Sequence, residues 1–238
     1  PVAHRRFLID YYTGEFKETA ARGKPFGHNA KTGDARISGS LASLVGLETA
    51  IESGDPKAID DAIKMIMLLH GMIMSFGGIP LLYYGDEIGT TNDYRYIEDE
   101  RKSGDTRWMH RPTFDWEKAE LRNKPNTVEG RIFNALKKMI SVRKEIPAFA
   151  DFNNRELRDS GNPHLFAFCR VNPQNFSDRV LVVGNFDAHP QHMEFDKLKD
   201  INFMQHQQLY DLYSGEKPAM FKNALVIPPY HFYWIQAT

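Results

Sequence analysis

The sequence predicts a chain with an α/β part followed by an all-β part. Two features predict the first part: an amphipathic helical pattern over residues 56–76, and a continuous apolar run, Ile79–Tyr84, directly behind it. Such a run behind an amphipathic helix is typical of a strand that is buried on both faces of a parallel sheet. The third feature, short alternating runs of apolar and polar residues from about 155 to 238, predicts an antiparallel β-sandwich.

Residues 1–40 show no sustained period, because glycines and a proline interrupt a mostly polar segment. This composition is typical of a functional loop region or of a segment that packs against another part of a protein. From residue 41 the apolar side chains fall on one face of a short helix, which Ser38 or Ser40 can cap.

The longer helix has clear end signals. Asp55 is positioned to cap it, Pro56 stands in its first turn, and glycine at 77 and 78 ends it. The polar residues between about 90 and 126 have no clear period, and a further helix is predicted over residues 128–142. The helical period begins at residue 41, and the pattern of apolar residues changes from helical to alternating near residue 146. We therefore expect three parts, over residues 1–40, 41–146 and 147–238.

The composition excludes several classes of protein. With 238 residues, 42% apolar and 26% charged, the chain is typical of a globular protein. A net charge of −1 argues against a nucleic-acid partner and against a polybasic membrane surface. The single cysteine, Cys169, excludes a disulfide within the chain and fits a reducing cytoplasm. No secretory signal is visible, but the chain begins with Pro1 rather than Met, which leaves secretion open.

Common catalytic patterns are absent from the sequence. It contains no glycine-rich phosphate loop, no HExxH zinc motif, no GxSxG elbow and no dense set of oxygen ligands for calcium. The sequence therefore predicts neither a metal site nor a cofactor.

Two motifs carry a resemblance to a known family. Residues 78–89 (GIPLLYYGDEIG) resemble the last barrel strand of the α-amylase family of glycoside hydrolases and transglycosidases, and residues 102–112 (KSGDTRWMHRP) resemble the stretch that follows it in the sucrose-acting branch. Further stretches resemble the amylosucrase group or the closing strand of the family's C-terminal domain: residues 4–8, 21–26, 32–39 and 225–230.

The resemblance implies a fold and a reaction. Residues 1–40 are then the tail of an inserted subdomain, 41–146 the C-terminal part of a (β/α)8 TIM barrel, and 147–238 the β-sandwich. Amylosucrases transfer glucose from sucrose to an α-1,4-glucan with retention of configuration and release fructose. Retention requires two carboxyl groups about 5–5.5 Å apart. The resemblance places the catalytic Asp, Glu and Asp upstream of Pro1, so it implies no catalytic residue in this chain.

The binding residues that the resemblance implies are mostly arginines. Arg107 matches an arginine that holds the donor glucose, since a planar guanidinium fixes hydroxyls or a carboxylate in one orientation. Arg36 matches an arginine on the acceptor or fructosyl side, and Arg5 with Phe7 matches an oligosaccharide-binding patch. The alternative to these binding roles is that the arginines are solvated surface charges and that Phe7 is a buried aromatic ring.

Asp86 and Glu87 follow the apolar run directly. Neighbouring residues at a strand end point in different directions, and the family does not use this pair catalytically. We expect one of them to cap the next turn or to brace the pocket from behind.

The expected partners follow from this assignment. They are sucrose, an α-glucan acceptor and the N-terminal part of the same polypeptide, or further copies of the chain that cover the edges of the strand at 79–84. Three alternatives stay open at this point: a sucrose hydrolase, another sucrose- or maltose-acting α-amylase-family enzyme such as a phosphorylase, and a non-catalytic carbohydrate-binding module. The helices between residues 56 and 142 argue against the last, because a binding sandwich does not need them.

Overall fold

The structure is a computed structural model that describes residues 2–201, 203 and 208–237. It contains two compact units, one formed by the described residues of 1–66 and 82–134 and the other by those of 67–81 and 135–238. The division passes through helices α4 (Pro56–Phe76) and α6 (Val128–Lys144). The domain limits expected near residues 40 and 146 therefore stay a prediction.

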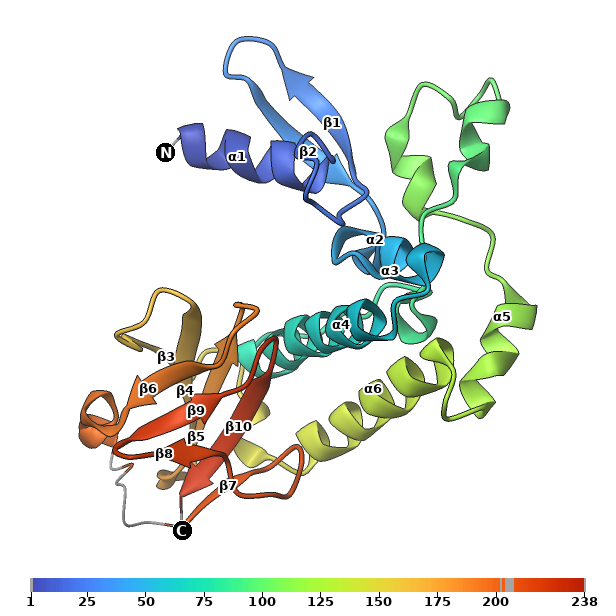
Figure 1. Ribbon diagram of the computed structural model, residues 1–238. Helices are drawn as coiled ribbons and strands as arrows, with labels where there is room; N and C mark the ends of the chain where they lie inside the picture. Colours follow the sequence, from blue (N-terminus) through green and yellow to red (C-terminus); the bar gives the residue numbers. More distant parts are fainter. Residues whose placement is uncertain (1, 202, 204–207, 238) are drawn as a thin grey trace. The chain divides into compact units, whose positions relative to one another are not determined.

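The first unit consists of short helices, one hairpin and 3-10 turns (Figure 1). Apart from its parts of α4 and α6, its helices and strands are α1 (Val2–Tyr12), β1 (Lys24–Asn29), β2 (Asp34–Ser38), α2 (Leu41–Leu44), α3 (Leu47–Ser53) and α5 (Trp116–Glu120). Its 3-10 helices are Asp86–Ile88, Tyr94–Glu98, Thr106–His110 and Leu121–Asn123.

The helix ends follow the sequence signals. The Ser40 hydroxyl accepts the Ser43 N–H at 3.2 Å and begins α2, and the Asp55 carboxylate accepts the Lys57 N–H at 2.9 Å in the first turn of α4. The short helix expected from residue 41 is two helices, because Gly46 adopts the left-handed conformation (φ 88°) between α2 and α3.

The second unit is a sandwich of two antiparallel sheets, as expected. The larger sheet has the order β3-β4-β5-β10-β7 and the smaller one the order β6-β9-β8. Side chains from both sheets share one buried core, including Cys169, Leu181, Met193 and Leu225. The strands are β3 (Arg155–Arg158), β4 (Leu165–Asn172), β5 (Asn175–Asn185), β6 (Gln191–Glu194), β7 (Leu209–Asp211), β8 (Met220–Phe221), β9 (Ala224–Ile227) and β10 (Phe232–Ala237). The 3-10 helices of this unit are Pro147–Phe149, Phe195–Lys197 and Lys199–Ile201.

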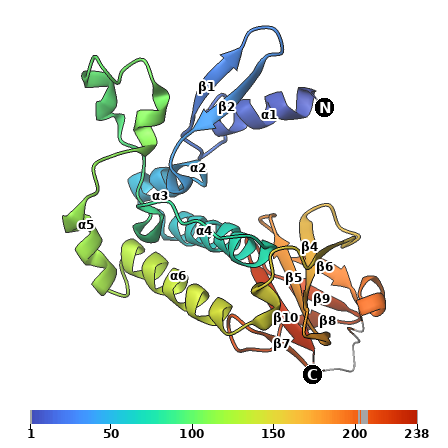
Figure 2. The same cartoon turned by 180° about the vertical axis from the view of Figure 1, so that it is seen from behind.

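The second half of α4 packs on the outer face of the larger sheet (Figure 2). A Cβ atom on Gly71 would lie 2.7 Å from the ring of Phe232, so only glycine permits this distance between helix and strand. The Trp234 indole on β10 donates to the Gly71 carbonyl at 3.3 Å. The helix and the sheet are therefore in direct contact at this point.

A buried arginine joins three segments of the second unit. Arg170 on β4 is fully buried, and its guanidinium donates to Asn154 Oδ1 at 2.5 Å and to the carbonyl oxygens of Ser75 and Asp151. Burial lowers the pKa of Arg170 to about 10. Its bonds satisfy a carbonyl at the end of α4 that the helix itself leaves without a partner.

The expected strand over Ile79–Tyr84 is absent, and this prediction was wrong. These residues are an irregular segment outside all the sheets, and the side chains of Ile79 and Leu81 are 84% and 78% exposed. An apolar run forms a strand only where a neighbouring strand accepts its hydrogen bonds. Within the described residues, no strand pairs with this segment.

Within the same described ranges, none of the helices combines the length and the apolar character needed to cross a bilayer.

Candidate functional site

The hairpin β1–β2 of the first unit brings two of the predicted arginines together. Phe26 on β1 is the register partner of Arg36 on β2. The guanidinium of Arg107 lies over the same Phe26 ring, 4.5 Å from its centroid. Arg36 and Arg107, which are far apart in the sequence, are therefore both neighbours of one aromatic side chain.

Hydrogen bonds fix the 3-10 helix of Arg107 against this hairpin. The Thr106 hydroxyl lies 3.3 Å from both the Pro25 carbonyl and the Ser38 hydroxyl, which belong to its two strands. The hairpin and the Thr106–His110 turn thus form one surface, with a cation stacked on an aromatic ring, an arrangement that stabilises both groups.

Arg5 also contacts the hairpin, whereas the ring of Phe7 packs against aromatic side chains of the N-terminal segment. The Arg5 guanidinium donates to the Asp34 carboxylate at 3.1 Å, at the start of β2. Phe7 stacks on Tyr11 (centroids 6.2 Å apart) and contacts Phe16, and it is half exposed. Both side chains are accessible, as an oligosaccharide-binding patch requires.

Asp86 and Glu87 lie on a different element, the 3-10 helix Asp86–Ile88. The Glu87 carboxylate accepts the Gly85 N–H at 2.7 Å, which closes the turn where the chain enters this helix. Burial, with a smaller contribution from the charge of Glu87, raises the pKa of Asp86 to about 6, although a backbone hydrogen bond acts in the opposite direction. Asp86 is therefore a carboxyl group that changes its charge close to neutral pH.

A local motif recurs three times along residues 93–107. Asp93, Asp99 and Asp105 each accept the backbone N–H of an arginine two residues later and bind its guanidinium through Nε and Nη2. For Arg107 the distances are 2.9 Å from Nε to Asp105 Oδ1 and 2.7 Å from Nη2 to Asp105 Oδ2. These bonds lower the pKa of Asp105 to about 2. One edge of the Arg107 guanidinium, which is predicted to bind the donor glucose, is thus bound to Asp105.

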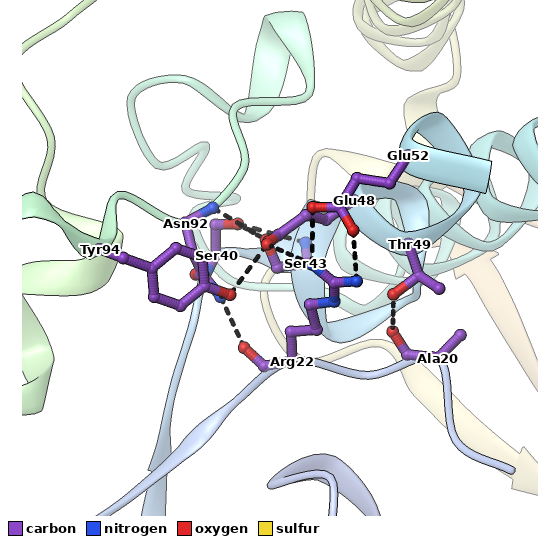
Figure 3. Close-up of polar contacts among 9 residues, drawn as sticks. All are labelled: Ala20, Arg22, Ser40, Ser43, Glu48, Thr49, Glu52, Asn92 and Tyr94. Atoms are coloured by element: carbon purple, nitrogen blue, oxygen red, sulfur yellow. Dashed lines mark hydrogen bonds and ion pairs between the residues drawn. The ribbon is translucent and has the colours of Figure 1, made fainter. Parts of the chain in front are cut away.

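A polar network surrounds the buried carboxylate of Glu48 (Figure 3). Glu48 at the start of α3 accepts hydrogen bonds from Arg22 Nη1 (3.2 Å), from the Tyr94 hydroxyl (2.8 Å) and from Ser43. Arg22 also forms a bidentate pair with Glu52, at 2.7 and 2.5 Å. This pairing raises the pKa of Arg22. The network joins the strand before β1 to α3 and to the segment at 94.

Asn92 completes this network. Its side chain accepts the Ser40 N–H at 2.8 Å and donates to the Arg22 carbonyl at 2.5 Å, and its own N–H binds the Ser43 hydroxyl (Figure 3). The sequence gives no local signal for this network, because its members are separated by up to 70 residues. The Asp-x-Arg repeat, in contrast, is visible in the sequence and was not used to predict a site.

Two cavities border this region. One, of ≈ 210 Å³, is lined by residues that include Arg22, Gly23, Lys24 and Tyr94. The other, of ≈ 330 Å³, lies among the 3-10 turns and is lined by Asp93, Arg95, Tyr96, Asp99, Lys102, Trp108, Arg111, Pro112 and Thr113. Arg107 lines neither of these two cavities, although its neighbour Trp108 lines the larger one. In the part of the chain that the structure describes, no three His, Cys, Asp or Glu side chains are grouped to hold a metal ion.

Comparisons with known proteins show which enzymes this chain is similar to. The chain is 26% identical over 201 residues to the trehalose synthase/amylase TreS of Mycobacterium tuberculosis, which covers 76% of this chain and 33% of that protein. It is 30% identical over 200 residues to the enzyme of the same name from Mycolicibacterium smegmatis. This match covers 73% of this chain and 33% of that protein. The chain therefore spans about a third of the length of the curated relatives that it matches.

Among solved structures, AmyP in complex with maltose matches with a TM-score of 0.54 at 14% identity, over 76% of this chain and 35% of that one. At this identity the match concerns the fold alone. No protein-family model matches the sequence. The homologues are nonetheless members of the α-amylase family, and the structural neighbours are TIM-barrel enzymes of that family, of which this chain covers a part.

Proposed function

We propose that this chain is the C-terminal part of a retaining glucosyltransferase that resembles amylosucrase. The complete protein would transfer glucose from sucrose to an α-1,4-glucan and release fructose. The observation that carries the proposal is the sequence similarity of three quarters of the chain to carbohydrate-converting enzymes of the α-amylase family. The motifs at residues 78–89 and 102–112 support the sucrose-acting branch within it.

The proposed binding roles rest on the hairpin surface. Arg107 would hold the donor glucose with the edge of its guanidinium that Asp105 does not occupy. Arg36 would bind the acceptor or the fructosyl unit, and Arg5 with Phe7 would bind a longer oligosaccharide. The place of Arg36 opposite Phe26 in the hairpin, together with the Arg107 guanidinium over the Phe26 ring, supports a common ligand, because it brings two donor groups to one surface.

The catalytic carboxyl groups of the proposed enzyme lie outside residues 1–238, so we expect this chain alone to be inactive. The exposed apolar side chains of Ile79 and Leu81 support a contact with the remaining part of the polypeptide, since exposed apolar patches are typical of interfaces. In that contact the segment would gain the strand partners that it lacks here.

A second candidate function is the synthesis of trehalose or an amylase activity. It is favoured by the names of the sequence relatives, which are trehalose synthase/amylase enzymes. A sucrose hydrolase is the other alternative, because hydrolysis differs from transfer only in the acceptor.

The products of the complete polypeptide distinguish these reactions. With sucrose and a short glucan, we expect more free fructose than free glucose, together with a lengthened glucan. Equal amounts of fructose and glucose would indicate hydrolysis. No reaction with sucrose but formation of trehalose from maltose would replace the proposal by the second candidate.

Two matched arginine variants test the binding role. We expect Arg107→Lys to lower kcat/KM for sucrose by about tenfold or more, because an ammonium lacks the rigid planar fork with which a guanidinium binds Asp105 and a ligand in fixed orientations. Arg101→Lys changes the same Asp-x-Arg motif at a side chain that is 88% exposed, and it should leave kcat/KM unchanged. Equal effects of the two substitutions would contradict the role of Arg107.

A further inference from the structure

The side chain of Asn92 joins both ends of the hairpin β1–β2. Its oxygen accepts the Ser40 N–H at 2.8 Å, just after β2, and its nitrogen donates to the Arg22 carbonyl at 2.5 Å, just before β1 (Figure 3). An asparagine amide carries an acceptor and a donor on one group, so it matches these two backbone groups at once. The two ends of the hairpin are therefore bound to one side chain.

The same residue begins the segment that carries Arg107. The Asn92 N–H donates to the Ser43 hydroxyl at 2.9 Å, and the next N–H, that of Asp93, donates to the Met109 carbonyl at 2.8 Å. Met109 is fully buried and belongs to the same 3-10 helix as Arg107. The chain at Asn92 is thus connected by short hydrogen bonds both to the hairpin and to the helix of Arg107.

The direct contacts between this helix and the hairpin are longer. The Thr106 hydroxyl lies 3.3 Å from both of its partners on the hairpin, whereas hydrogen bonds of hydroxyl groups are most often about 2.7–2.8 Å long. The two bonds of the Asn92 side chain to the ends of the hairpin are shorter, at 2.8 and 2.5 Å. We therefore expect Asn92 to hold the hairpin beside the helix more strongly than Thr106 does.

We propose that Asn92 is a positioning residue for the ligand surface, which consists of Arg36, Arg107 and Phe26. It holds the hairpin and the helix in the one arrangement in which the Arg107 guanidinium lies over the Phe26 ring. A displacement of about 1 Å in a binding group can lower the rate of an enzyme about a hundredfold, so an amide that fixes both elements acts on the reaction without touching the ligand. The ligand roles of the two arginines rest on the proposed function, whereas the contact of Arg107 with Phe26 does not.

Two substitutions of Asn92 test this role. Asn92→Asp keeps the size of the side chain and the acceptor for the Ser40 N–H, but it places a second acceptor opposite the Arg22 carbonyl in place of the donor. Asn92→Ser removes both bonds without this repulsion, and it replaces the first variant if that one does not fold. The control is Asn126→Asp, which makes the same chemical change at an exposed residue of the same unit.

The first measurement is NMR of the full chain, in which no reaction is involved. The Phe26 ring should shift the Nε–H proton signal of Arg107, because the guanidinium lies over the ring. Phe26→Leu, which has no ring, gives the position of the signal without this shift. We expect Asn92→Asp to move the signal most of the way to that position and Asn126→Asp to leave it unchanged. A signal that stays in place in both Asn92 variants would overturn the proposal.

The second measurement is kcat/KM of the complete polypeptide for sucrose, at a temperature at which each variant is fully folded. We expect a loss of about tenfold or more for Asn92→Asp and no change for Asn126→Asp. A merely structural role would lower the Tm and leave kcat/KM of the folded enzyme unchanged, and that result would contradict the positioning role. If the polypeptide does not act on sucrose, the proposed function fails, and the NMR comparison by itself decides the role of Asn92.

Discussion

The contribution of the buried Arg170 guanidinium to stability can be tested by a substitution that keeps the volume of its side chain. Arg170→Met keeps most of the side-chain volume but removes all the donors. It leaves three acceptors without this partner, the buried Ser75 carbonyl and the part-buried Asp151 carbonyl and Asn154 Oδ1. Each such acceptor costs about 2 kcal/mol.

The substitution also removes a burial penalty. The lowered pKa of Arg170, about 10 against an ordinary value of 12.5, indicates that burying the charge costs about 3 kcal/mol. The free energy lost with the three hydrogen bonds is larger than the burial penalty that the substitution removes. We therefore expect Arg170→Met to lower the free energy of unfolding by about 3 kcal/mol, or the Tm by about 10 °C.

The assay is thermal and urea unfolding, followed by circular dichroism of the sheet signal. Arg179→Met is the matched control on the neighbouring strand β5, because the one hydrogen bond that Arg179 donates within the described part of the chain goes to the exposed Phe176 carbonyl, at 3.0 Å. It should stay within about 0.5 kcal/mol of the unchanged chain. If Arg170→Met unfolds like Arg179→Met, the three acceptors do not need the guanidinium, and the reasoning fails.

Three further outcomes are expected from unfolding measurements. The raised pKa of Asp86, about 6 in the folded state, means that the folded chain binds a proton more tightly there, so stability should fall as pH rises from about 4 to 6. Asp86→Asn should remove this dependence and gain about 1 kcal/mol at pH 7, and an unchanged pH profile would contradict it. Glu48→Ala should cost about 3 kcal/mol, because it leaves the hydroxyls of Tyr94 and Ser43 without this acceptor and removes one of the two carboxylates that pair with Arg22. Glu52→Ala, at an exposed carboxylate, should leave the Tm unchanged. Gly71→Ala should cost about 1–3 kcal/mol through the clash with β10, whereas Gly104→Ala, with open space around it, should not destabilise.

The local elements of this chain could be predicted because their signals lie within a few residues. The caps at Ser40 and Asp55 are where the sequence predicts them. The sandwich follows from alternation, since successive side chains of a strand face opposite sides of a sheet. The order of its strands, with β10 between β5 and β7, has no signal in the sequence.

The segment Ile79–Tyr84 shows that an apolar run in the sequence does not by itself predict a strand. Its apolar run predicts a buried strand, but burial requires neighbouring strands, and none of the described residues provides them. The same sequence therefore forms an exposed segment here. Apolar character predicts a preference for burial, and the partner decides whether the strand forms.

In the candidate site too, some features depend on residues that are close in the sequence and others depend on tertiary packing. The sequence by itself determined the helix ends, the alternating strands and the Asp-x-Arg motifs, because each depends on residues close together in the chain. Only the tertiary structure decided that Arg107 lies over the ring of Phe26, the register partner of Arg36, and that Glu48 holds Arg22 and Tyr94 in one network. Such contacts join residues dozens of positions apart, and they form only where the packing of the whole unit is favourable.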